Sequence, residues 1–461
     1  MSRVAFAVSA PTVDALRAIN YSPFAERIRL SLKGASTPLG DLCSFGTSYG
    51  SVFTRQDCAP EAGISLLAQS DMFATEPACR IIRKDSLPRP AAHYVHDGQI
   101  LIAGAGQMGE ATLFGRAILA DARLSGKYLG PDVLALTPVA KENDYALYLY
   151  AYLASRTGLA LLRSTAYGTS IPRLRIDLLR NLPVVLPPSE LVSRVAACVR
   201  LAQAKRAAAK ELRDEARRHI CGTTAYLDAE QMLKGSRRRA VRWSGPLTTL
   251  RAWNVASTGG ALEHLQHSWS GRLHDVLKPE GLFQGPRFAR VACNVPFGID
   301  LLSQRDVFMI RRIPRRIARP SVPDSELFTT DDALLLACDG QLSQGTLFGR
   351  VELSATVERS TAISEHILRV IPKAGYLGVA YAFLSSEVGH RLLQGTAVGT
   401  SIPKMRLDLV SHLPYPDLPS SVRTAIEGLI RQSAVLRCEA DFEERAAANL
   451  VDSEVIEPWL S

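Results

Sequence analysis

The sequence contains no convincing copy of the short motifs that mark the common enzyme active sites. It lacks the phosphate loop G-x-x-x-x-G-K-[ST] of ATP-dependent enzymes, and neither a convincing H-E-x-x-H nor a convincing G-x-S-x-G appears. The Asx-Pro-Pro-aromatic loop of amino-methyltransferases is also missing, because the only Pro-Pro pair lies in LPPS, at 186–189. These absences argue against ATP-driven work, zinc-dependent or serine hydrolysis, and base methylation by this chain.

Two further absences bear on location. No run approaches the ~20 apolar residues that a membrane-spanning helix needs, and the N-terminal MSRVAFAVSAPTVDAL is too weak for a secretory signal. The eight cysteines form no C-x-x-C pair, which argues against a zinc ribbon and a thioredoxin-type site. Dispersed cysteines are typical of a reducing compartment, so we expect a cytoplasmic protein.

Histidine gives no support for a metal site. The pairs His93/His96 and His264/His267 have H-x-x-H spacing, but they do not occupy equivalent positions in the repeat described below. No Cys or carboxylate pattern completes either site. We therefore expect no metal, no cofactor and no catalytic residue, and we do not expect an enzyme.

What is present is an ordinary globular composition with a basic balance. The 461 residues are 47% hydrophobic and 21% charged, which suggests two or more domains with real cores. With 54 Lys and Arg against 45 Asp and Glu, the net charge is +9. A basic surface favours a polyanionic partner, although many basic proteins bind nothing acidic.

The dominant feature is an internal duplication. GTSIPRLRIDLLRNLP, at 168–183, returns as GTSIPKMRLDLVSHLP at 399–414, with ten of the sixteen residues identical. Three more pairs keep the same order: LRAIN with LRAWN, LLAQSDMF with LLSQRDVF, and GQMGEATLFGR with GQLSQGTLFGR. The offsets are 231, 234, 235 and 234 residues, which indicates two tandem copies of one unit.

Each copy ends in a stretch with the pattern of a long helix. After Ser189, Leu191, Val195, Cys198, Ala202, Ala209, Leu212 and Ala216 recur at three- and four-residue steps, with Lys205 interrupting. After Ser420, Val422, Ile426, Leu429, Ser433, Leu436 and Ala440 repeat the pattern. Two such seams most simply bury each other in a coiled coil, and the alternative is that each helix packs only on its own domain.

The rest of each copy mixes short β-rich runs with helical stretches, which predicts an α+β domain. GQILIAGAG and DALLLACDG read as strands, whereas 145–162 and 375–393 read as helices. We expect a first domain at 1–187, a central helix at 188–222, a second domain at 223–418, and a C-terminal helix and tail at 419–461.

Candidate nucleic-acid contacts come from basic stretches and from the repeated motifs. IRRIPRRIARP and CRIIRKDSLPRP stand at the same distance after LL-x-Q-x-D-x-F and keep their basic character, although a solvated charged loop is the alternative. GTSIP supplies a glycine, two hydroxyls and a following cation, which suit a phosphate, although an ordinary turn would use them too. The glutamines of GQ and the arginines of TLFGR suit adenine and guanine.

The candidate DNA-binding residues of the first copy are Arg80, Arg83, Lys84, Arg89, Gln107, Arg116, Thr169, Ser170 and Arg173. Those of the second copy are Arg311, Arg312, Arg315, Arg316, Gln341, Arg350, Thr400, Ser401 and Lys404. Residues identical in both copies suit a shared framework, and we expect bases to be read by side chains that differ between the copies.

The two-copy layout resembles the specificity (S) subunit of type I restriction-modification systems. The features that carry the resemblance are Q-x-D-x-F, a strand like GQILI, and GTSIP-x-x-R-x-DL-x-x-LP, each followed by a long helix and each present twice. The match covers nearly the whole chain. The usual PP-x-x-EQ entrance to the helix is only partly kept, as LPPSELVSR and DLPSSVRTA.

The resemblance implies two target recognition domains, each reading one half of a bipartite double-stranded DNA site, held apart by an antiparallel coiled coil. It implies two partner modification subunits that methylate adenine N6 with S-adenosylmethionine, and in many systems restriction and translocase subunits, with no catalysis by the chain itself. Two alternatives stay open: a duplicated enzyme of unfamiliar type, and a scaffold or anti-restriction protein that binds methyltransferase subunits without reading DNA.

Overall fold

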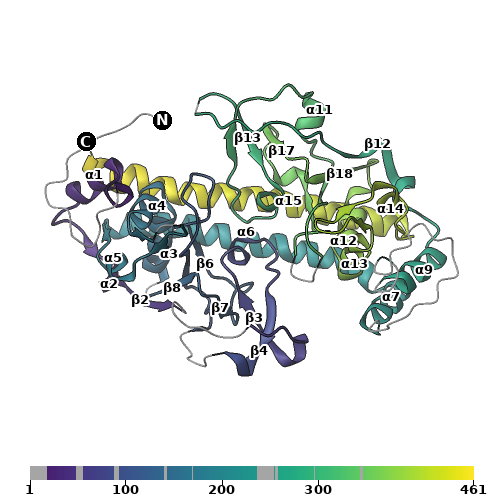
Figure 1. Ribbon diagram of the computed structural model, residues 1–461, viewed down its shortest axis with the longest axis horizontal. Coiled ribbons are helices and arrows are strands. Elements are labelled where there is room, and N and C mark those ends of the chain that lie inside the picture. Colours follow the sequence, from purple (N-terminus) through teal and green to yellow (C-terminus); the bar gives the residue numbers. More distant parts are fainter. Residues whose placement is uncertain are drawn as a thin grey trace. The chain divides into compact units, whose positions relative to one another are not determined.

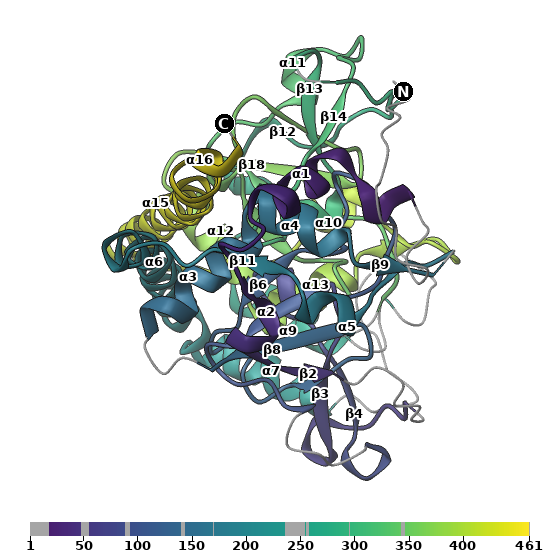
Figure 2. The ribbon, with the colours of Figure 1, turned by 90° about the vertical axis from the view of Figure 1, so that its left-hand side faces the viewer.

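The computed structural model of the chain describes residues 18–47, 55–87, 93–139, 143–168, 170–235, 254, 258–294, 296–342 and 346–460. The chain forms two compact units (Figures 1 and 2). The first unit comprises residues 1–204 with 440–461, and the second comprises 205–439. Both units contain sheets and helices, so the protein is α+β, as the sequence predicts.

The main elements of the first unit run in chain order from a short helix through two sheets to a long helix. They are α1 (Pro23–Ser31), β1 (Thr37–Pro38), α2 (Leu39–Leu42), β2 (Cys43–Thr47), β3 (Gly63–Leu67), β4 (Arg80–Arg83), β5 (Ile100–Ala103), β6 (Ala117–Leu119), β7 (Tyr128–Leu129), β8 (Val133–Pro138), α3 (Asn143–Ala154), α4 (Arg156–Arg163), β9 (Ala166–Tyr167), β10 (Arg173–Leu174), α5 (Ile176–Arg180), β11 (Pro183–Val184) and α6 (Ser189–Cys221).

The second unit repeats this order after one further helix among the described residues, α7 (Thr224–Gly235), and α9 (Gly259–Ser268) stands in the place of α1. Its elements are α7 (Thr224–Gly235), α9 (Gly259–Ser268), β12 (Leu277–Gln284), β13 (Ile299–Leu302), α10 (Gln304–Val307), β14 (Arg315–Ile317), α11 (Asp324–Leu327), β15 (Leu334–Ala337), β16 (Val351–Leu353), β17 (Thr361–Ile363), β18 (Ile367–Pro372), α12 (Leu377–Leu384), α13 (Glu387–Gln394), β19 (Ala397–Val398), β20 (Lys404–Met405), α14 (Leu407–Ser411) and α15 (Ser420–Leu450). A π-helix (Val451–Ile456) and α16 (Glu457–Leu460) end the chain within the first unit.

The sheets of the two units have the same topology. A four-stranded sheet has the order β2-β8-β5-β6 in the first unit and β12-β18-β15-β16 in the second. A smaller, three-stranded sheet has the order β4-β3-β7 in the first unit and β14-β13-β17 in the second. In both small sheets the central strand pairs antiparallel with one neighbour and parallel with the other. The repeated sequence therefore encodes a repeated fold.

A repeated asparagine ties the start of each copy to its end. The side-chain amide of Asn20 donates to the carbonyl oxygens of Ser164 and Ala166, at 2.6 and 2.8 Å. Asn254 donates in the same way to Gly395 and Ala397, at 2.5 and 2.7 Å. Because one buried amide satisfies two carbonyls, this residue explains why LRAIN and LRAWN share their last letter.

Each stretch expected as one apolar helix is two helices. α3 ends before Ser155, whose hydroxyl accepts from the Gly158 amide at 3.0 Å and so caps α4. Ser386 caps α13 in the same way, accepting from the Gly389 amide at 3.1 Å. A serine hydroxyl that takes an orphan helix amide starts a new helix, which the apolar pattern alone did not reveal.

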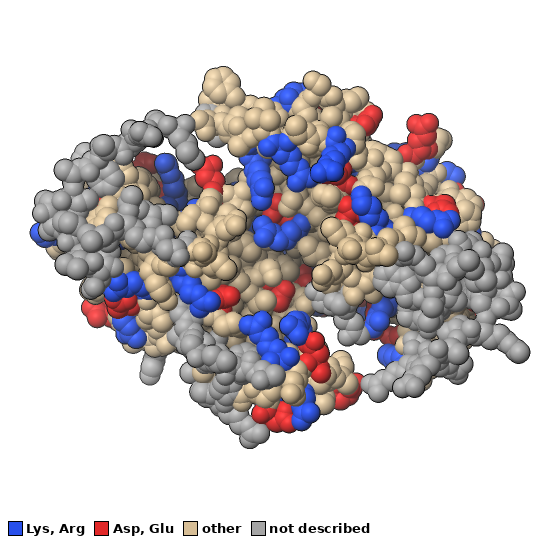
Figure 3. Space-filling model, in the orientation of Figure 1, with Lys and Arg blue, Asp and Glu red and all other residues tan. Residues whose placement is uncertain are grey.

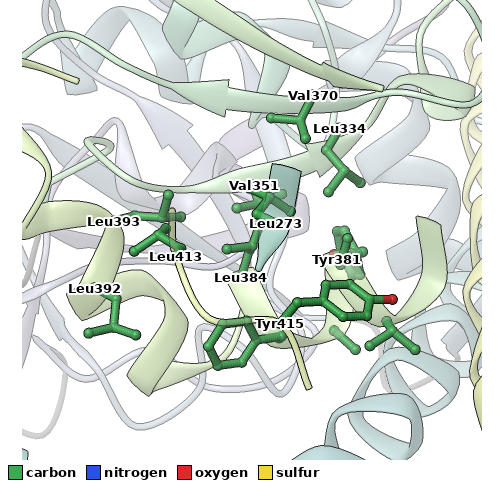
Figure 4. Packing of buried hydrophobic residues seen from close by; sticks show 14 of the residues in the cluster. Leu273, Leu334, Val351, Val370, Tyr381, Leu384, Leu392, Leu393, Leu413 and Tyr415 are labelled. Carbon is green, nitrogen blue, oxygen red and sulfur yellow. The ribbon is translucent and has the colours of Figure 1, made fainter. Parts of the chain in front are cut away.

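The core of the second unit gathers around its four-stranded sheet. Leu334, Val351 and Val370 come from the strands, and Tyr381 and Leu384 come from α12, packed on the sheet (Figure 4). Trp269 lies edge-on to Phe383, with 5.2 Å between the ring centroids. The core of the first unit has the corresponding composition, with strand residues packed on α3 and α4.

The long helices α6 and α15 pack against each other. In the first unit, Arg194 of α6 pairs with Glu454 at 2.7 Å. Val195 of α6 and Val451 share one apolar cluster there. In the second unit, Lys205 pairs with Glu439 at 3.2 Å. The early part of α6 thus meets the late end of the C-terminal helix and its later part meets an earlier segment, so the pairing is antiparallel, as predicted.

The buried seam of these helices is offset from the one predicted. Val195, Ala202, Ala209 and Ala216 of α6 are buried as expected, whereas Leu191, Cys198 and Leu212 are only half-buried. The positions between them are filled instead by Val192, Val199 and Arg213. The sequence pattern favoured Leu212 over its neighbour Arg213, whereas the packed helix places this arginine in the seam.

Arg213 of this seam and Glu444, its counterpart on α15, each contact a tyrosine hydroxyl. The two tyrosines occupy equivalent positions in the two units. In the second unit, Arg213 donates to the Tyr381 hydroxyl at 3.4 Å. In the first unit, the Tyr150 hydroxyl donates to Glu444. Tyr150 and Tyr381 are related by the 231-residue offset, and so are Arg213 and Glu444. The contact between a tyrosine hydroxyl and a charged seam residue therefore occurs in both units, with an arginine in the second unit and a glutamate in the first.

Asp71, from the Q-x-D-x-F motif of the first copy, makes the stability of the first unit depend on pH. Burial raises the pKa of its carboxyl to about 6, although the carboxylate accepts from the Ala68 amide at 3.1 Å. The folded state holds this proton more tightly than the unfolded chain, so this contribution to stability falls as pH rises between the unfolded pKa and the folded one.

Asp71→Asn keeps a hydrogen-bond acceptor and removes the charge. The variant should exceed the wild type in unfolding free energy by on the order of 2 kcal/mol at pH 7.5, with a smaller gap at about pH 4.5. Guanidinium unfolding at the two pH values checks this. A gap that does not change with pH would contradict the assignment of the charge penalty to Asp71.

Candidate nucleic-acid interface

A short hairpin carries the GTSIP motif in each unit. β9 pairs with β10 in the first unit, and β19 pairs with β20 in the second. The motif glycine adopts a positive φ in both, 89° at Gly168 and 103° at Gly399, which a residue with a side chain rarely adopts. Ser170 of the first hairpin is exposed, as are Thr400 and Ser401 of the second.

The hairpin lies against the loop that carries the repeated glutamine. In the first unit the Gly106 amide donates to the Pro172 carbonyl at 3.1 Å, and the next residue, Gln107, is exposed. In the second unit the Gly340 amide donates to the Pro403 carbonyl at 3.0 Å, and Gln341 is exposed. These backbone bonds bring together motifs that are about 60 residues apart in the sequence.

A second glutamine, not among the candidates from the sequence, holds this loop in place. Gln69 accepts from the Ala105 amide at 3.1 Å. Gln304 accepts from the Asp339 amide at 3.1 Å and donates to its carbonyl at 2.7 Å. Both come from LL-x-Q-x-D-x-F, so their identity in the two copies is the signal that could have found them. They are positioning residues.

The cation of each hairpin lies above a carboxylate. In the first unit Arg173 pairs with Asp132 at 3.1 Å. In the second, Lys404 lies 3.8 Å from Asp339, which is 6% exposed and also contacts His366 Nδ1. Strands β8 and β18 follow Asp132 and His366 directly, so these two residues are equivalent. The site is built alike in both units, with different charged side chains beneath it.

We define the hairpin site as the residues of this loop and hairpin that face solvent or bear charge. It comprises Gln107, Ser170 and Arg173 in the first unit, and Gln341, Thr400, Ser401 and Lys404 in the second. Hydroxyls, amides and one cation on exposed backbone are the groups that most often contact phosphate oxygens.

The arginines of the first small sheet are largely paired. Arg80 forms a fork with Asp57, at 2.9 and 3.0 Å, and holds the pKa of that carboxyl below its usual value. Arg83 pairs with Asp85 in the same way. Lys84 is exposed and forms no ion pair within the described ranges. Much of the positive charge expected here is therefore compensated locally.

The arginines of the second small sheet differ from one another in what they contact. Arg312 is nearly buried, and its guanidinium donates to the Val307 carbonyl at 3.2 Å and to the Thr356 hydroxyl at 2.7 Å. Arg316 pairs with Asp300 at 3.0 Å. Arg315 is exposed and has no ion pair among the residues that the structure describes. Arg311 is half-buried.

The strip that contains these arginines is anchored from the long helix. Arg437 of α15 is 3% exposed, and one of its terminal nitrogens donates to the carbonyls of Met309 and Ile310, at 2.8 and 3.0 Å. These carbonyls directly precede Arg311. A buried guanidinium that satisfies two main-chain carbonyls fixes where the strip begins.

The arginines of the repeated TLFGR motif face the protein. Arg116 donates to the carbonyls of Thr112 and Glu110, at 2.9 and 2.7 Å, and so closes the loop that follows Gln107. Arg350 is half-buried. Arg116 thus serves the loop's shape. Two other candidates, Arg89 and Thr169, lie outside the described residues.

The surface carries mixed charge: Figure 3 shows Lys and Arg side chains interspersed with Asp and Glu. Among the described residues, no group of three or more His, Cys, Asp or Glu has the arrangement to hold a metal ion. Within the same residues, no helix has the length and hydropathy to cross a membrane.

No family model matches the sequence, and no curated protein is similar to it. Solved structures do align with most of the chain. The type I restriction-modification S subunit from M. genitalium is 11% identical, with a TM-score of 0.31, covering 92% of this chain and 94% of that one. The HsdS subunit from Thermoanaerobacter tengcongensis is 16% identical, with a TM-score of 0.25, covering 90% and 95%.

A third solved structure concerns complex assembly and conformational transition of the type I R-M system. It is 16% identical, with a TM-score of 0.27, and the alignment covers 90% of this chain and 96% of that one. TM-scores of this size are too low to carry an argument about function.

Proposed function

We propose that the chain is the DNA-specificity subunit of a type I restriction-modification complex or a related methylation-based defence complex. Each unit binds one half of a bipartite site in double-stranded DNA. The chain positions two adenine-N6 methyltransferase subunits, and in a restricting system also the translocase subunits, and has no catalytic activity itself. The proposal rests on the chain's own repeats and side chains.

The observation that carries the proposal is the hairpin site, present once in each unit with the same hairpin, a positive φ at the same glycine, and an exposed glutamine, an exposed serine and a cation in both. A contact needed twice in identical form is one that does not depend on base sequence, and the phosphate backbone offers such a contact. Two matched phosphate-binding sites on one chain suit a ligand that is itself repetitive, as duplex DNA is.

A second observation favours recognition over a purely structural role. The strand pairing is shared, but the small sheets present different side chains: Arg80 is forked to Asp57, whereas the equivalent Arg315 has no ion pair among the described residues and Ala292 stands in the place of Asp57. Base edges are distinguished by the side chains that reach them. Two domains with one framework and different surfaces suit two different half-sites.

The duplicated-enzyme alternative receives little support from titratable groups. The pair His366–Asp339 has the geometry of a catalytic dyad, but the other ring nitrogen, Nε2, lies 3.4 Å from a second carboxylate, that of Glu365. The first copy has Ala105 and Asp132 at the equivalent positions. A duplicated active site would repeat its reactive groups.

The scaffold or anti-restriction alternative makes a different demand on charge. A protein that occupies the DNA site of a methyltransferase complex without reading DNA mimics DNA best when it is acidic, whereas this chain carries +9. An exposed unpaired arginine on one small sheet and hydroxyl-rich hairpins on both units suit binding of DNA better than imitation of it.

Methylation mapping across a genome tests the proposal. In a host that carries the gene, adenine N6 methylation should occur at a split sequence motif with an unread gap, and it should disappear when this gene alone is deleted. Chain purified from the same host should bring methyltransferase subunits with it. A methylation pattern unchanged by the deletion would refute the proposal.

A further inference from the structure

A six-residue segment that begins with a cysteine and ends with a glycine leads into the central strand of each small sheet. In the second unit it runs from Cys293 to Gly298, and in the first from Cys58 to Gly63, an offset of 235 residues. A Cβ added at Gly298 would lie 2.3 Å from Cys293 Sγ and 2.1 Å from the Ile317 carbonyl oxygen. At Gly63 it would lie 2.6 Å from Cys58 Sγ. The contact between the cysteine sulfur and the glycine therefore recurs in both units, although the glycine backbone differs, with φ of 75° at Gly298 and −121° at Gly63.

The side chain that precedes the glycine differs between the copies. Phe297 is 73% exposed, the largest exposed fraction among the described large apolar side chains. Its counterpart in the first unit is Ala62. An isolated exposed apolar residue needs no explanation on an ordinary surface. Here, however, the contact between cysteine and glycine recurs in both copies whereas the exposed residue before the glycine differs, which is the pattern expected of a residue that reads the partner.

The backbone of Pro296 and Phe297 is hydrogen-bonded to the side chain of Arg316. Arg316 donates through Nε to the Phe297 carbonyl at 2.8 Å and through a terminal nitrogen to the Pro296 carbonyl at 3.3 Å, while the same guanidinium pairs with Asp300. The Phe297 amide donates to the Asn294 carbonyl at 2.9 Å. The first unit has Ile81 in the place of Arg316, so this brace belongs to the second unit only.

A free cation lies beside the brace on the same strand. Arg315 neighbours Arg316 on β14, is exposed, and has no ion pair within the described part of the chain. Its counterpart Arg80 is neutralised by Asp57. The second small sheet therefore combines an exposed phenylalanine, whose backbone carbonyl is bound by Arg316, with a guanidinium that has no ion pair among the described residues. An aromatic or apolar side chain that stacks on or between bases, next to a cation for phosphate, is a recurring combination in nucleic-acid binding.

We propose that Phe297 stacks against or wedges into a base step of the DNA half-site bound by the second unit, with Arg315 holding a nearby phosphate. The assignment rests on the proposed function and adds to it a specificity-determining residue and the class of its contact. Because Ala62 occupies the equivalent position, the first unit reads its half-site without this contact.

The test uses the full-length chain, together with the modification subunits that co-purify with it, and a library of random-sequence duplexes. The wild-type protein should enrich a bipartite motif. Phe297→Ala should bind the enriched duplex roughly tenfold more weakly, and selection with this variant should lose base preference in one half of the motif only. Phe297→Trp should bind the duplex with an affinity within about threefold of the wild-type value, since tryptophan keeps an aromatic face.

Phe442→Ala provides a matched control, because Phe442 is also a strongly exposed phenylalanine, 65% exposed, and belongs to α15 and not to the small sheet. It should leave the enriched motif unchanged. If Phe297→Ala leaves both halves of the motif unchanged, the stacking role is refuted while the proposed function stands. Equal loss of both halves, not restored by tryptophan, also refutes it, since the defect is then one of folding. If the wild-type protein enriches no motif, the proposed function and this inference fail together.

Discussion

Gly389→Ala should unfold most of the second unit, and Gly158→Ala should do the same to the first. An added Cβ at Gly389 would lie 2.0 Å from the Phe383 carbonyl oxygen and 2.8 Å from the Leu384 Cα. At Gly158 it would lie 2.0 Å from the Tyr152 carbonyl oxygen. Both clashes are with backbone, which cannot move aside as a flexible side chain does. We expect a loss of roughly 3 kcal/mol or more in unfolding free energy.

Hydrogen exchange followed by mass spectrometry checks this unit by unit. In Gly389→Ala, peptides from 277–413 should lose protection, whereas peptides from 63–185 should keep it, and the reverse should hold for Gly158→Ala. Gly428→Ala is the control: this glycine lies inside α15 with no atom within 4 Å of an added Cβ. Alanine there should stabilise by about 0.5–1 kcal/mol. Destabilisation of the control, or normal protection in both test variants, would contradict the packing described.

The second prediction concerns the balance of charge on the two small sheets. Arg315→Ala should weaken DNA binding by about tenfold at 0.1 M salt and should lower the slope of log K against log salt by about 1, the value for one phosphate contact. Asp57→Ala should have the opposite effect, because it releases Arg80 from its ion pair and leaves the first sheet with an unpaired guanidinium like the second.

Fluorescence anisotropy titrations of a labelled duplex at several salt concentrations measure both effects. Arg218→Ala serves as the control for charge, since this arginine is exposed on α6 and pairs with Glu211; its salt slope should equal that of the wild type. If the slope is the same for Arg315→Ala and the wild type, Arg315 does not contact phosphate. If Asp57→Ala binds no better than the wild type, Arg80 does not face the duplex.

The basic stretches could be interpreted from the sequence only in part. The sequence indicated cationic strips at matched distances after a shared motif, and the structure places Arg80 and Arg315 at equivalent strand positions. It could not show that Arg80 is neutralised by Asp57, a residue 23 positions away that meets it only when β4 folds back. Nor could it show that Arg312 is turned inward, because its acceptor at Thr356 is 44 positions distant.

The candidate site shows the same division. GTSIP and the GQ loop were both predicted to contact nucleic acid because they occur twice, and a repeat can be recognised from the sequence alone. The two motifs form one hairpin site because single backbone hydrogen bonds join them, such as the one from the Gly106 amide to the Pro172 carbonyl. A sequence pattern does not predict such bonds. Gln69 and Gln304 were equally repeated, yet their role as supports of the loop became visible only through their acceptors and donors.

The sequence by itself determined that one α+β unit occurs twice and that each copy ends in a long helix, because duplicated residues and a 3,4 apolar spacing are written in the order of the chain. The tertiary structure alone decided which side chains fill the helix seam, where Ser155 and Ser386 divide the apolar helices, and which arginines remain free to bind. The physical reason is that burial and charge pairing depend on neighbours in space. An arginine is available only when no carboxylate folds back to meet it.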